Sequence, residues 1–288
     1  MKKILVTGAS GYIGRHIVET LLKKGQQVFV TDLDMSCYGD EVTKMDIPLF
    51  DGNVNIYNEM DCPDICIHLA WKDGFSHKAH SHMENLSSHY VFIRNMLSGG
   101  LPQIVVMGSM HEVGYWKGAV TEETPANPLS YYGIAKNALR EATRELCKEY
   151  GATYQWIRAF YILGDDMKNH SIFTKIIEAE NEGKKVFPFT TGKNKYDFID
   201  VNELSEQIAL TAMQKEISGV INCCSGVPVS LGDKVEEFLR KKNFKIQLQY
   251  GAFPERPYDS PEIWGDNSKI KKIIENYRNT GGIENSEC

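Results

Sequence analysis

The sequence predicts an α/β fold in which a doubly wound parallel sheet carries helices on both faces, with a small α+β lobe built from later segments. Short apolar runs alternate with amphipathic stretches over the first half of the chain, and this alternation is typical of parallel strands joined by right-handed helical crossovers. A glycine-rich turn joins the first apolar run to the first amphipathic stretch. The alternation weakens after residue 164, which indicates a change of architecture.

The composition is that of a folded globular protein, with 288 residues of which 42% are hydrophobic and 24% charged. This length suits one large domain or two unequal ones. The formal net charge of -6 argues against nucleic acid or an anionic membrane as a partner. The sequence shows neither a signal peptide nor a membrane span, and its seven cysteines lack C-x-x-C spacing. We therefore expect a soluble, cytoplasmic protein with reduced thiols.

The expected strands are short and rich in β-branched residues, and the expected helices show apolar residues at helical spacing. Strands are predicted at 3–6, 27–31, 65–69, 103–107, 154–159 and 219–223. Helices are predicted at 14–24, 83–98, 130–149 and 202–215. These elements assign residues 1–164 and 197–227 to the larger domain.

The smaller lobe is expected to comprise residues 165–196 and 228–288. Its predicted elements are helices at 171–182 and 232–242, a strand at 244–250 and a proline-rich loop at 254–261. The tail after Tyr277 is polar and glycine-rich, so we expect it to be frayed.

The glycine-rich turn has the pattern G-x-x-G-x-x-G, directly after a predicted strand and at the start of a predicted helix. Such a turn lets the backbone approach a pyrophosphate closely and directs the helix amides at it. A glycine turn without a ligand is the alternative, but the flanking strand and helix favour a Rossmann dinucleotide-binding domain. The candidate cofactor-binding residues of this turn are Gly8, Ser10, Gly11, Tyr12, Ile13 and Gly14.

An acidic residue follows the second predicted strand, at Asp32. A carboxylate at this distance from the glycines accepts hydrogen bonds from the adenosine ribose hydroxyls and repels a 2′-phosphate. Asp32 therefore favours NAD over NADP. Two alternatives stay open: Asp34 takes this position, or Arg15 binds a 2′-phosphate.

Tyr132 and Lys136 form a Y-x-x-x-K pair on a predicted helix, and this spacing puts both side chains on one helix face. The Lys136 ammonium is expected to lower the pKa of Tyr132, so that the phenol exchanges a proton with a carbinol or carbonyl oxygen. Ser109 follows another predicted strand, at the sheet edge where α/β proteins bind ligands. The alternative is an ordinary surface pair on a helix.

With these motifs, the chain from residue 3 to about 272 resembles the extended short-chain dehydrogenase/reductase family, the NAD-dependent epimerase/dehydratase group. Trp71 departs from this pattern, because it stands where the family usually has an alanine. Further stretches that carry the resemblance are Asp46-Ile47, the strand ending in Leu69-Ala70, Glu123-Thr124-Pro125, Asp197 to Val201, and Arg256-Pro257-Tyr258-Asp259.

The resemblance implies roles for these residues in an enzyme that acts on a nucleotide-linked sugar in deoxysugar or polysaccharide biosynthesis. Tyr132 would be the acid/base, Lys136 would orient the nicotinamide ribose and Ser109 would position the reacting oxygen. Arg256 would hold the substrate diphosphate, and Met110 and Tyr161 would also contact the substrate. Further cofactor contacts would come from Asp46, Ile47, Leu69, Ala70 and Trp71. The family also implies a homodimer formed through the helices at 83–98 and 130–149.

The residues after Ser109 bear on the type of reaction. Family dehydratases have Asp-Glu there, whereas this chain has Met110 and His111. Met110 exchanges no protons, and Glu112 would serve only if the alignment shifted by one residue, so dehydration is disfavoured. His111 either protonates a sugar carbon or hydrogen-bonds the substrate, and we favour the second.

Tyr161 replaces the asparagine that usually contacts the phosphate, which argues against a UDP-hexose 4-epimerase. The pattern is most similar to reductases of dTDP- or CDP-4-keto-6-deoxyhexoses, with dTDP favoured. The alternatives are an NDP-hexose 4-epimerase and a non-catalytic NAD-binding regulator. Net NADH loss, isomer interconversion, or binding without turnover would distinguish the three.

Four histidines lie close together in the sequence, at His77, His80, His82 and His89. They invite a metal-binding hypothesis, but the expected chemistry needs no metal. We expect them to line a loop and the start of a helix.

Overall fold

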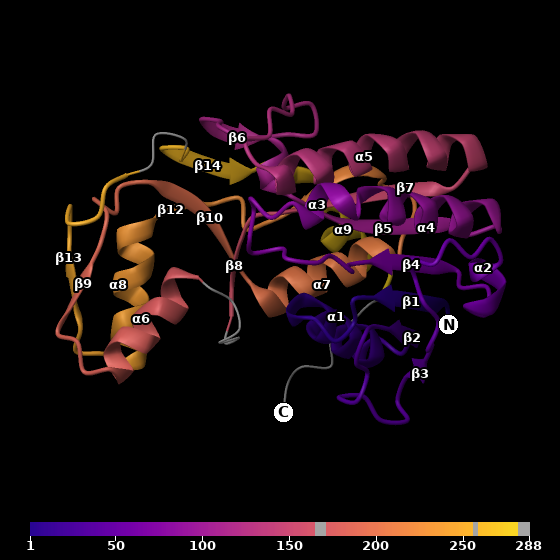
Figure 1. The fold of residues 1–288 in the computed structure, drawn as a ribbon, viewed down its shortest axis with the longest axis horizontal. Coiled ribbons are helices and arrows are strands. Elements are labelled where there is room, and N and C mark those ends of the chain that lie inside the picture. Colours follow the sequence, from indigo (N-terminus) through magenta and orange to yellow (C-terminus); the bar gives the residue numbers. More distant parts are fainter. Residues whose placement is uncertain (165–170, 256–258, 282–288) are drawn as a thin grey trace.

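The computed structural model describes residues 1–164, 171–255 and 259–281, and it confirms the predicted Rossmann-like architecture (Figure 1). Among the described residues, seven parallel strands form the large sheet in the order β11-β7-β5-β4-β1-β2-β3. Their bounds are β1 Lys3–Thr7, β2 Gln27–Thr31, β3 Thr43–Lys44, β4 Ile65–His68, β5 Gln103–Ser109, β7 Thr153–Ala159 and β11 Gly219–Cys223. The order reverses between β1 and β4, which is where such sheets bind ligands.

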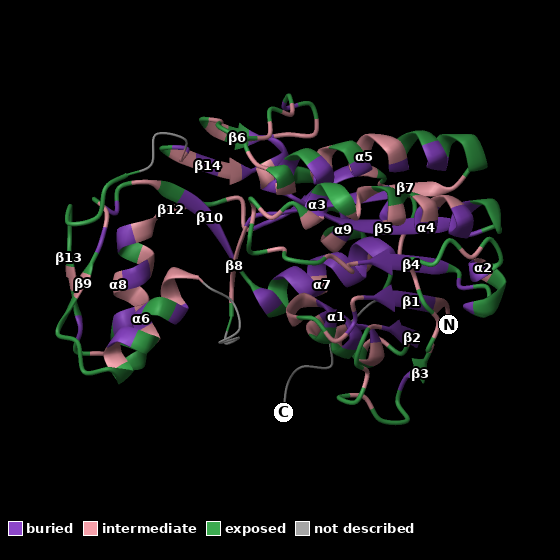
Figure 2. Cartoon of the chain, in the orientation of Figure 1, coloured by how far each residue is buried: buried purple, intermediate pink, exposed green. Residues whose placement is uncertain are grey.

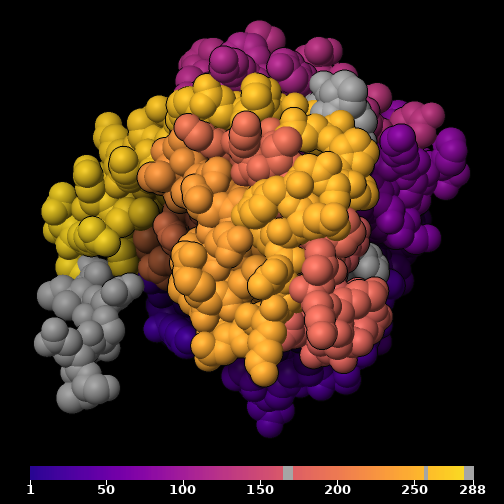
Figure 3. Space-filling view, turned by 90° about the vertical axis from the view of Figure 1, so that its left-hand side faces the viewer, coloured from indigo at the N-terminus to yellow at the C-terminus, as the bar shows by residue number. Residues whose placement is uncertain are grey.

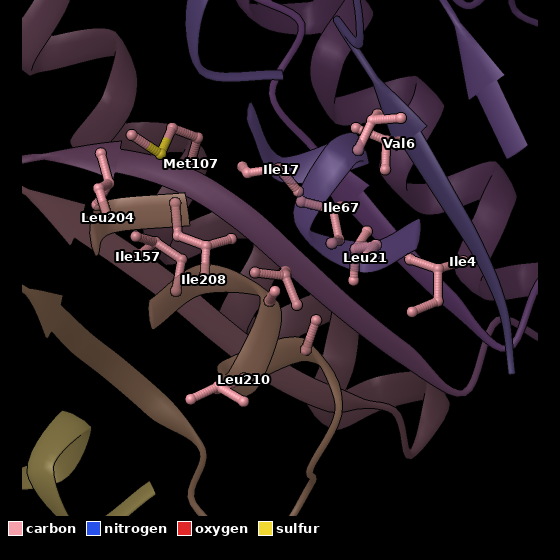
Figure 4. Packing of buried hydrophobic residues seen from close by; sticks show 14 of the residues in the cluster. Ile4, Val6, Ile17, Leu21, Ile67, Met107, Ile157, Leu204, Ile208 and Leu210 are labelled. Carbon is pink, nitrogen blue, oxygen red and sulfur yellow. The ribbon is translucent and has the colours of Figure 1, made fainter. Parts of the chain in front are cut away.

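Helices cover both faces of the large sheet. Ile4 and Val6 of β1 belong to the buried cluster packed against α1 and α7, whereas Leu5 belongs to the cluster on the opposite face, against α4 and α5. Figure 4 shows the first cluster, and Figure 2 shows the buried central strands. These helices are α1 Tyr12–Lys23, α2 Ile56–Glu59, α3 Ser81–Glu84, α4 Leu86–Ser98, α5 Tyr131–Tyr150 and α7 Val201–Ala212. Successive side chains of a strand point to opposite faces of the sheet, so each strand contributes to both hydrophobic layers.

The long helix α5 begins and ends for local reasons. The Ser130 hydroxyl accepts a hydrogen bond from the Gly133 N–H at the N-terminus, and Gly151 ends the helix in the left-handed conformation with φ of 68°. The helix predicted at 83–98 is instead divided into α3 and α4 at Asn85. Asn85 serves as the C-cap of one and the N-cap of the other, since its side chain favours helix ends over helix interiors.

The smaller lobe lies to one side of the large sheet (Figure 1), and its segments cover the face shown in Figure 3. A second sheet joins this lobe to β6 and β8, which come from residues that the sequence analysis assigned to the larger domain. It has the order β12-β10-β14-β6, and β8 also pairs with β10. The strands are β6 Gly118–Val120, β8 Tyr161–Leu163, β10 Lys195–Asp200, β12 Pro228–Ser230 and β14 Glu262–Gly265, and a separate pair is β9 Val186–Pro188 with β13 Gln247–Gln249. Helices α6 Ile172–Asn181 and α8 Leu231–Lys242 pack together through Ile176, Val235 and Leu239.

A helix that the sequence analysis did not predict, α9, spans Ser268–Asn279. Its Ile270 and Ile273 are buried in the same cluster as α1 and α7. The chain thus returns to the large sheet after the smaller lobe, although we had expected residues 228–288 to lie wholly in that lobe. We propose that α9 belongs with the cofactor domain.

One buried carboxylate ties the two sheets together. Asp197 of β10 is fully buried and accepts hydrogen bonds from the backbone N–H groups of Ser225, Gly226 and Gly265. Its position lies between the end of β11 and β14, so it fixes the smaller lobe against the strands that carry the site. Among the described residues, no helix is long and apolar enough to span a membrane.

Candidate active site

The glycine turn between β1 and α1 is too closely packed for side chains. A Cβ at Gly8 would lie 2.6 Å from the Ala70 nitrogen, and one at Gly14 would lie 2.3 Å from the Gly8 carbonyl oxygen. Gly8 also has φ of 67°, in the left-handed region that glycine adopts readily. Gly11 caps α1 without any side chain, so no side chain competes for the first helix amides. This cradle fits a pyrophosphate.

The carboxylate of Asp32 hydrogen-bonds the glycine turn, whereas Asp34 contacts the turn through its backbone carbonyl oxygen, which accepts from the Ser10 hydroxyl. The Asp32 carboxylate accepts hydrogen bonds from the Ser10 N–H at 2.8 Å and the Leu33 N–H at 2.8 Å. Asp34 is exposed, and its carboxylate caps the local turn by accepting from the Ser36 N–H. The structure thus places Asp32 where the sequence analysis expected the ribose-binding acid.

The turn has a further support that the sequence analysis missed. Tyr38 donates a hydrogen bond from its hydroxyl to the Ala9 carbonyl oxygen at 2.6 Å, and burial raises the pKa of this phenol. No pattern around Tyr38 could have revealed this contact, because it joins the loop after β2 to the glycine turn across the tertiary structure.

The other expected cofactor contacts lie along the same edge of the sheet. The N–H of Leu69 donates to the Thr7 carbonyl oxygen at 3.1 Å, so the segment after β4 runs beside the glycine turn. Asp46 and Ile47 follow β3, the strand that pairs with β2. Tyr12 and Ile13 open α1. The predicted cofactor residues therefore line the carboxyl ends of β1 to β4.

Ser109, Tyr132 and Lys136 converge at the end of β5. Ser109 is the last residue of that strand, and its side chain lies close enough to Tyr132 to lower the pKa of the phenol. Lys136 is 2% exposed, and its Nζ donates to the Met107 carbonyl oxygen at 2.7 Å. The Lys136 Nζ lies 5.9 Å from the centroid of the Tyr132 ring. These three side chains have the geometry of an acid/base group with two supporting donors.

The expected lowering of the Tyr132 pKa is wrong for the protein alone. Burial raises the pKa of Tyr132 to about 12, although the Ser109 side chain acts in the opposite direction. Burial also lowers the pKa of Lys136 to about 7, with Glu112 opposing this effect. The sequence showed the pair on one helix face but could not show that loss of hydration dominates both groups.

His111 lies in the site, on a short 3-10 helix at Met110–Glu112. Its ring centroid is 6.0 Å from that of Tyr132 and 4.2 Å from that of His77. Burial and the neighbouring His77 lower the pKa of His111 to about 3. A neutral imidazole at physiological pH suits a hydrogen bond to substrate better than proton donation to carbon.

Glu112 points away from the site and supports Ser109 from behind. It is fully buried, and its Oε1 accepts from the Ser109 N–H at 2.7 Å and from Trp156 Nε1 at 2.9 Å. Its Oε2 lies 3.7 Å from Nε of Arg158. A carboxylate engaged in this way is not available to a sugar, which removes the shifted-alignment route to dehydration.

The histidines of the 77–89 segment lie closer to the site than we expected. The His77 ring stacks on the Tyr132 ring with centroids 5.0 Å apart. The backbone carbonyl oxygen of His77 accepts a hydrogen bond from the Tyr132 N–H. His82 lies 5.2 Å from Tyr132 between ring centroids. The contact of this segment with α5 is tertiary, so the histidine spacing alone could not reveal it.

The structure describes two of the three residues that were expected to contact the substrate. Met110 is buried in the cluster between the two lobes. Tyr161 packs its ring on Tyr196 at 4.3 Å between centroids, in the same cluster. Arg256 lies outside the described residues. Contact of any of these residues with substrate stays a prediction.

Comparison with known proteins places this site in a family. The model of the NAD dependent epimerase/dehydratase family matches residues 4–224. The chain belongs to this family. The predicted resemblance and the NAD cofactor are therefore confirmed.

Two curated proteins are similar to this chain along most of its length. The chain is 43% identical over 270 residues to a dTDP-6-deoxy-L-talose 4-dehydrogenase (NAD(+)) of Aggregatibacter actinomycetemcomitans, covering 91% of this chain and 98% of that protein. It is 30% identical over 319 residues to a UDP-glucose 4-epimerase of Neisseria meningitidis serogroup C, covering 95% and 92%.

Among solved structures, the fold matches a UDP-N-acetylglucosamine 4-epimerase of Methanobrevibacter ruminantium M1, crystallised with UDP-N-acetylmuramic acid. The TM-score is 0.81 at 23% identity, with 94% of this chain and 91% of that chain covered. This likeness supports the fold of the epimerase/dehydratase family.

Proposed function

We propose that the chain is an NAD(H)-dependent 4-ketoreductase of a dTDP-linked 6-deoxyhexose, which interconverts a C4 carbonyl and a C4 hydroxyl. The convergence of Ser109, Tyr132 and Lys136 beside the glycine turn is the observation that carries this proposal. The relative named a dTDP-6-deoxy-L-talose 4-dehydrogenase, 43% identical along almost its full length, supports the sugar and the reacting carbon.

The state of Tyr132 suits the reductive direction. With a pKa of about 12, the phenol is protonated at neutral pH and has a proton to give. In the reduction, the hydride comes from bound NADH. Tyr132 then transfers its hydroxyl proton to O4 of the sugar, and the Ser109 hydroxyl donates a hydrogen bond to the same oxygen.

Lys136 and His111 complete this proposal. The ammonium of Lys136, fixed by the Met107 carbonyl oxygen, stabilises negative charge that develops on the Tyr132 oxygen once its proton has left. The neutral ring of His111 offers one donor and one acceptor to a sugar hydroxyl. Lys136 is carried by α5, and His111 lies on the short 3-10 helix that directly follows β5.

The experiment supplies purified protein with NAD⁺ and dTDP-6-deoxy-L-talose, and with NADH and the corresponding 4-keto sugar. We expect NADH to form in the first mixture and to be consumed in the second, one for each sugar converted. Interconversion of hexose isomers without net change of NADH would favour a 4-epimerase. The similarity to a UDP-glucose 4-epimerase supports this second candidate. NADH binding without any turnover would favour a non-catalytic regulator.

We also propose a homodimer formed through the outer faces of α4 and α5. Tyr90 on α4 and Tyr131 and Ile134 on α5 are large apolar side chains that remain exposed in the single chain. Sedimentation velocity of the wild type and of Ile134→Lys tests this proposal. We expect a dimer and a monomer respectively, and a wild-type monomer at micromolar concentration would contradict it.

A further inference from the structure

The indole ring of Trp71 covers the ammonium group of Lys136. The Lys136 Nζ lies 3.7 Å from the centroid of the Trp71 ring, which is within the range of a cation–π contact. The same Nζ has the Met107 carbonyl oxygen as a hydrogen-bond acceptor. The two contacts define the position of the ammonium from two directions. Trp71 also stands where the sequence analysis noted a departure from the family pattern, which has a small alanine there.

Two buried histidines lock the indole ring in place. Trp71 Nε1 donates to Nδ1 of His82 at 3.0 Å, and His82 Nε2 lies 3.0 Å from the Ser76 carbonyl oxygen. A carbonyl only accepts, so Nε2 of His82 carries its proton and Nδ1 is free to accept from the indole. His89 stacks on Trp71 with centroids 4.5 Å apart and an interplanar angle of 18°.

His89 is itself anchored to the sheet. Its Nδ1 lies 3.0 Å from Nε2 of His68, whose Nδ1 lies 2.8 Å from the Thr7 hydroxyl. His68, His82 and His89 are each at most 3% exposed. Two of the histidines that drew attention in the sequence, His82 and His89, therefore serve to hold one tryptophan against one lysine.

The surroundings of Lys136 leave its amine only partly protonated at neutral pH. Burial lowers its pKa to about 7, and Glu112, from the 3-10 helix, is the nearby carboxylate that favours the charged form. The other titratable groups close to it are Tyr132 on α5, His68 on β4 and His89 on α4. His82 on α3 packs against Tyr132 and hydrogen-bonds Trp71. The pKa values of His68 and His89 are lowered by burial and by Lys136 itself, so these rings are neutral at pH 7 and add no repulsion.

We propose that Trp71 is a positioning residue of the reaction, which keeps the Lys136 ammonium charged and in place beside Tyr132 through its locked indole face. This inference rests on the proposed function only in that Lys136 works with Tyr132. The face of an aromatic ring stabilises a cation and gives nothing to a neutral amine. Loss of the ring should therefore lower the fraction of charged Lys136, and the effect should grow as the pH rises.

The kinetic test compares Trp71→Leu, Trp71→Phe and the control Trp264→Leu, after thermal melts have shown that each is folded. Relative to wild type, we expect kcat of Trp71→Leu to be within a factor of two at pH 5.5 and about one tenth at pH 8.5. A tenfold loss corresponds to a shift of one pKa unit, about 1.4 kcal/mol. We expect Trp71→Phe to regain most of kcat, the sugar KM to change less than twofold, and Trp264→Leu to match wild type at every pH. A deficit that is absent, that is equal at all pH values, or that phenylalanine does not relieve would overturn the proposal.

A second measurement needs neither substrate nor a Trp71 variant. Tryptophan fluorescence is followed from pH 5.5 to 9 in the wild type and in Lys136→Met, which share all four tryptophans. We expect the wild-type emission to change with one ionisation that Lys136→Met lacks. An ionisation that persists in Lys136→Met would belong to another group, and either that result or a flat wild-type profile would refute the inference. Because no sugar is involved, a protein that shows this ionisation but reduces no sugar contradicts the proposed function alone.

Discussion

Replacing Gly14 with alanine should weaken cofactor binding as well as the fold, and the geometry of the turn sets the scale. A Cβ at Gly14 would lie 2.3 Å from the Gly8 carbonyl oxygen and 2.5 Å from that of Ala9. Both contacts are with backbone, so α1 must move by about 0.7 Å to raise the closer separation to 3.0 Å. Forcing a methyl group into a packed site lowers the free energy of unfolding by about 1–3 kcal/mol. Each kcal/mol lost lowers the melting temperature by about 2–4 °C.

The same movement displaces the first amides of α1 from the cofactor pyrophosphate, so we expect the NADH Kd to rise at least about tenfold. Melting curves with and without NADH measure this directly. At a ligand concentration of about 100 times the wild-type Kd, wild type gains about 2.7 kcal/mol, and a variant with tenfold weaker binding gains about 1.4 kcal/mol.

Gly25→Ala is the matched comparison for Gly14→Ala. Gly25 has φ of 67° and nothing within 4 Å of an added Cβ, so alanine there costs about 1–2 kcal/mol of backbone strain and leaves NADH binding unchanged. If Gly14→Ala and Gly25→Ala lost stability but both bound NADH like wild type, the assignment of the glycine turn to the cofactor would be refuted.

Three other substitutions test the site. Asp32→Ser removes the carboxylate that repels a 2′-phosphate, so the kcat/KM ratio of NADPH to NADH should rise about tenfold or more, and an unchanged ratio would contradict the role of Asp32. Glu112→Leu leaves the buried N–H groups of Ser109 and Trp156 without their acceptor, so urea unfolding should show a loss of about 2–6 kcal/mol, against no measurable loss in the exposed control Glu149→Gln. Burial and the nearby Lys136 lower the pKa of His89 from its ordinary value of 6.5 to about 3 in the fold. The unfolded chain therefore binds the extra proton below pH 6.5, and stability should fall by about 2 kcal/mol between pH 7 and 5 from this group. His89→Gln should show a correspondingly smaller pH dependence, and an identical slope would exclude His89 as the source.

Local patterns predicted the elements around the cofactor well. The strand at 27–31 has the predicted bounds, and α5 starts at Tyr131, one residue after the predicted start at Ser130, which is its N-cap. The glycine turn and Asp32 also lie where their spacing indicated. These features depend on neighbours in the sequence, such as a cap, a turn glycine or a run of β-branched residues, so the sequence carries them directly.

The parts that were missed depend on tertiary contacts or on a pattern that was read too narrowly. Helix α9 has apolar residues at helical spacing, Ile270, Ile273 and Ile274. Because the residues beyond it are polar, the whole segment was predicted to lack a helix. The approach of Trp71 and His77 to α5 joins residues about sixty positions apart, and no local pattern specifies it. The pKa values of Tyr132 and Lys136 follow from burial, which their spacing does not show.

The transfer of deuterium tests the central claim most directly. NADH carrying deuterium at C4 of the nicotinamide, in each of its two stereoisomeric forms, is incubated with wild type and the dTDP-linked 4-keto-6-deoxyhexose. We predict that one form places deuterium on C4 of the product sugar, as seen by NMR, and that Tyr132→Phe slows this transfer about 100-fold or more while still binding NADH. Deuterium at another carbon, no transfer from either form, or full activity of Tyr132→Phe would contradict the account.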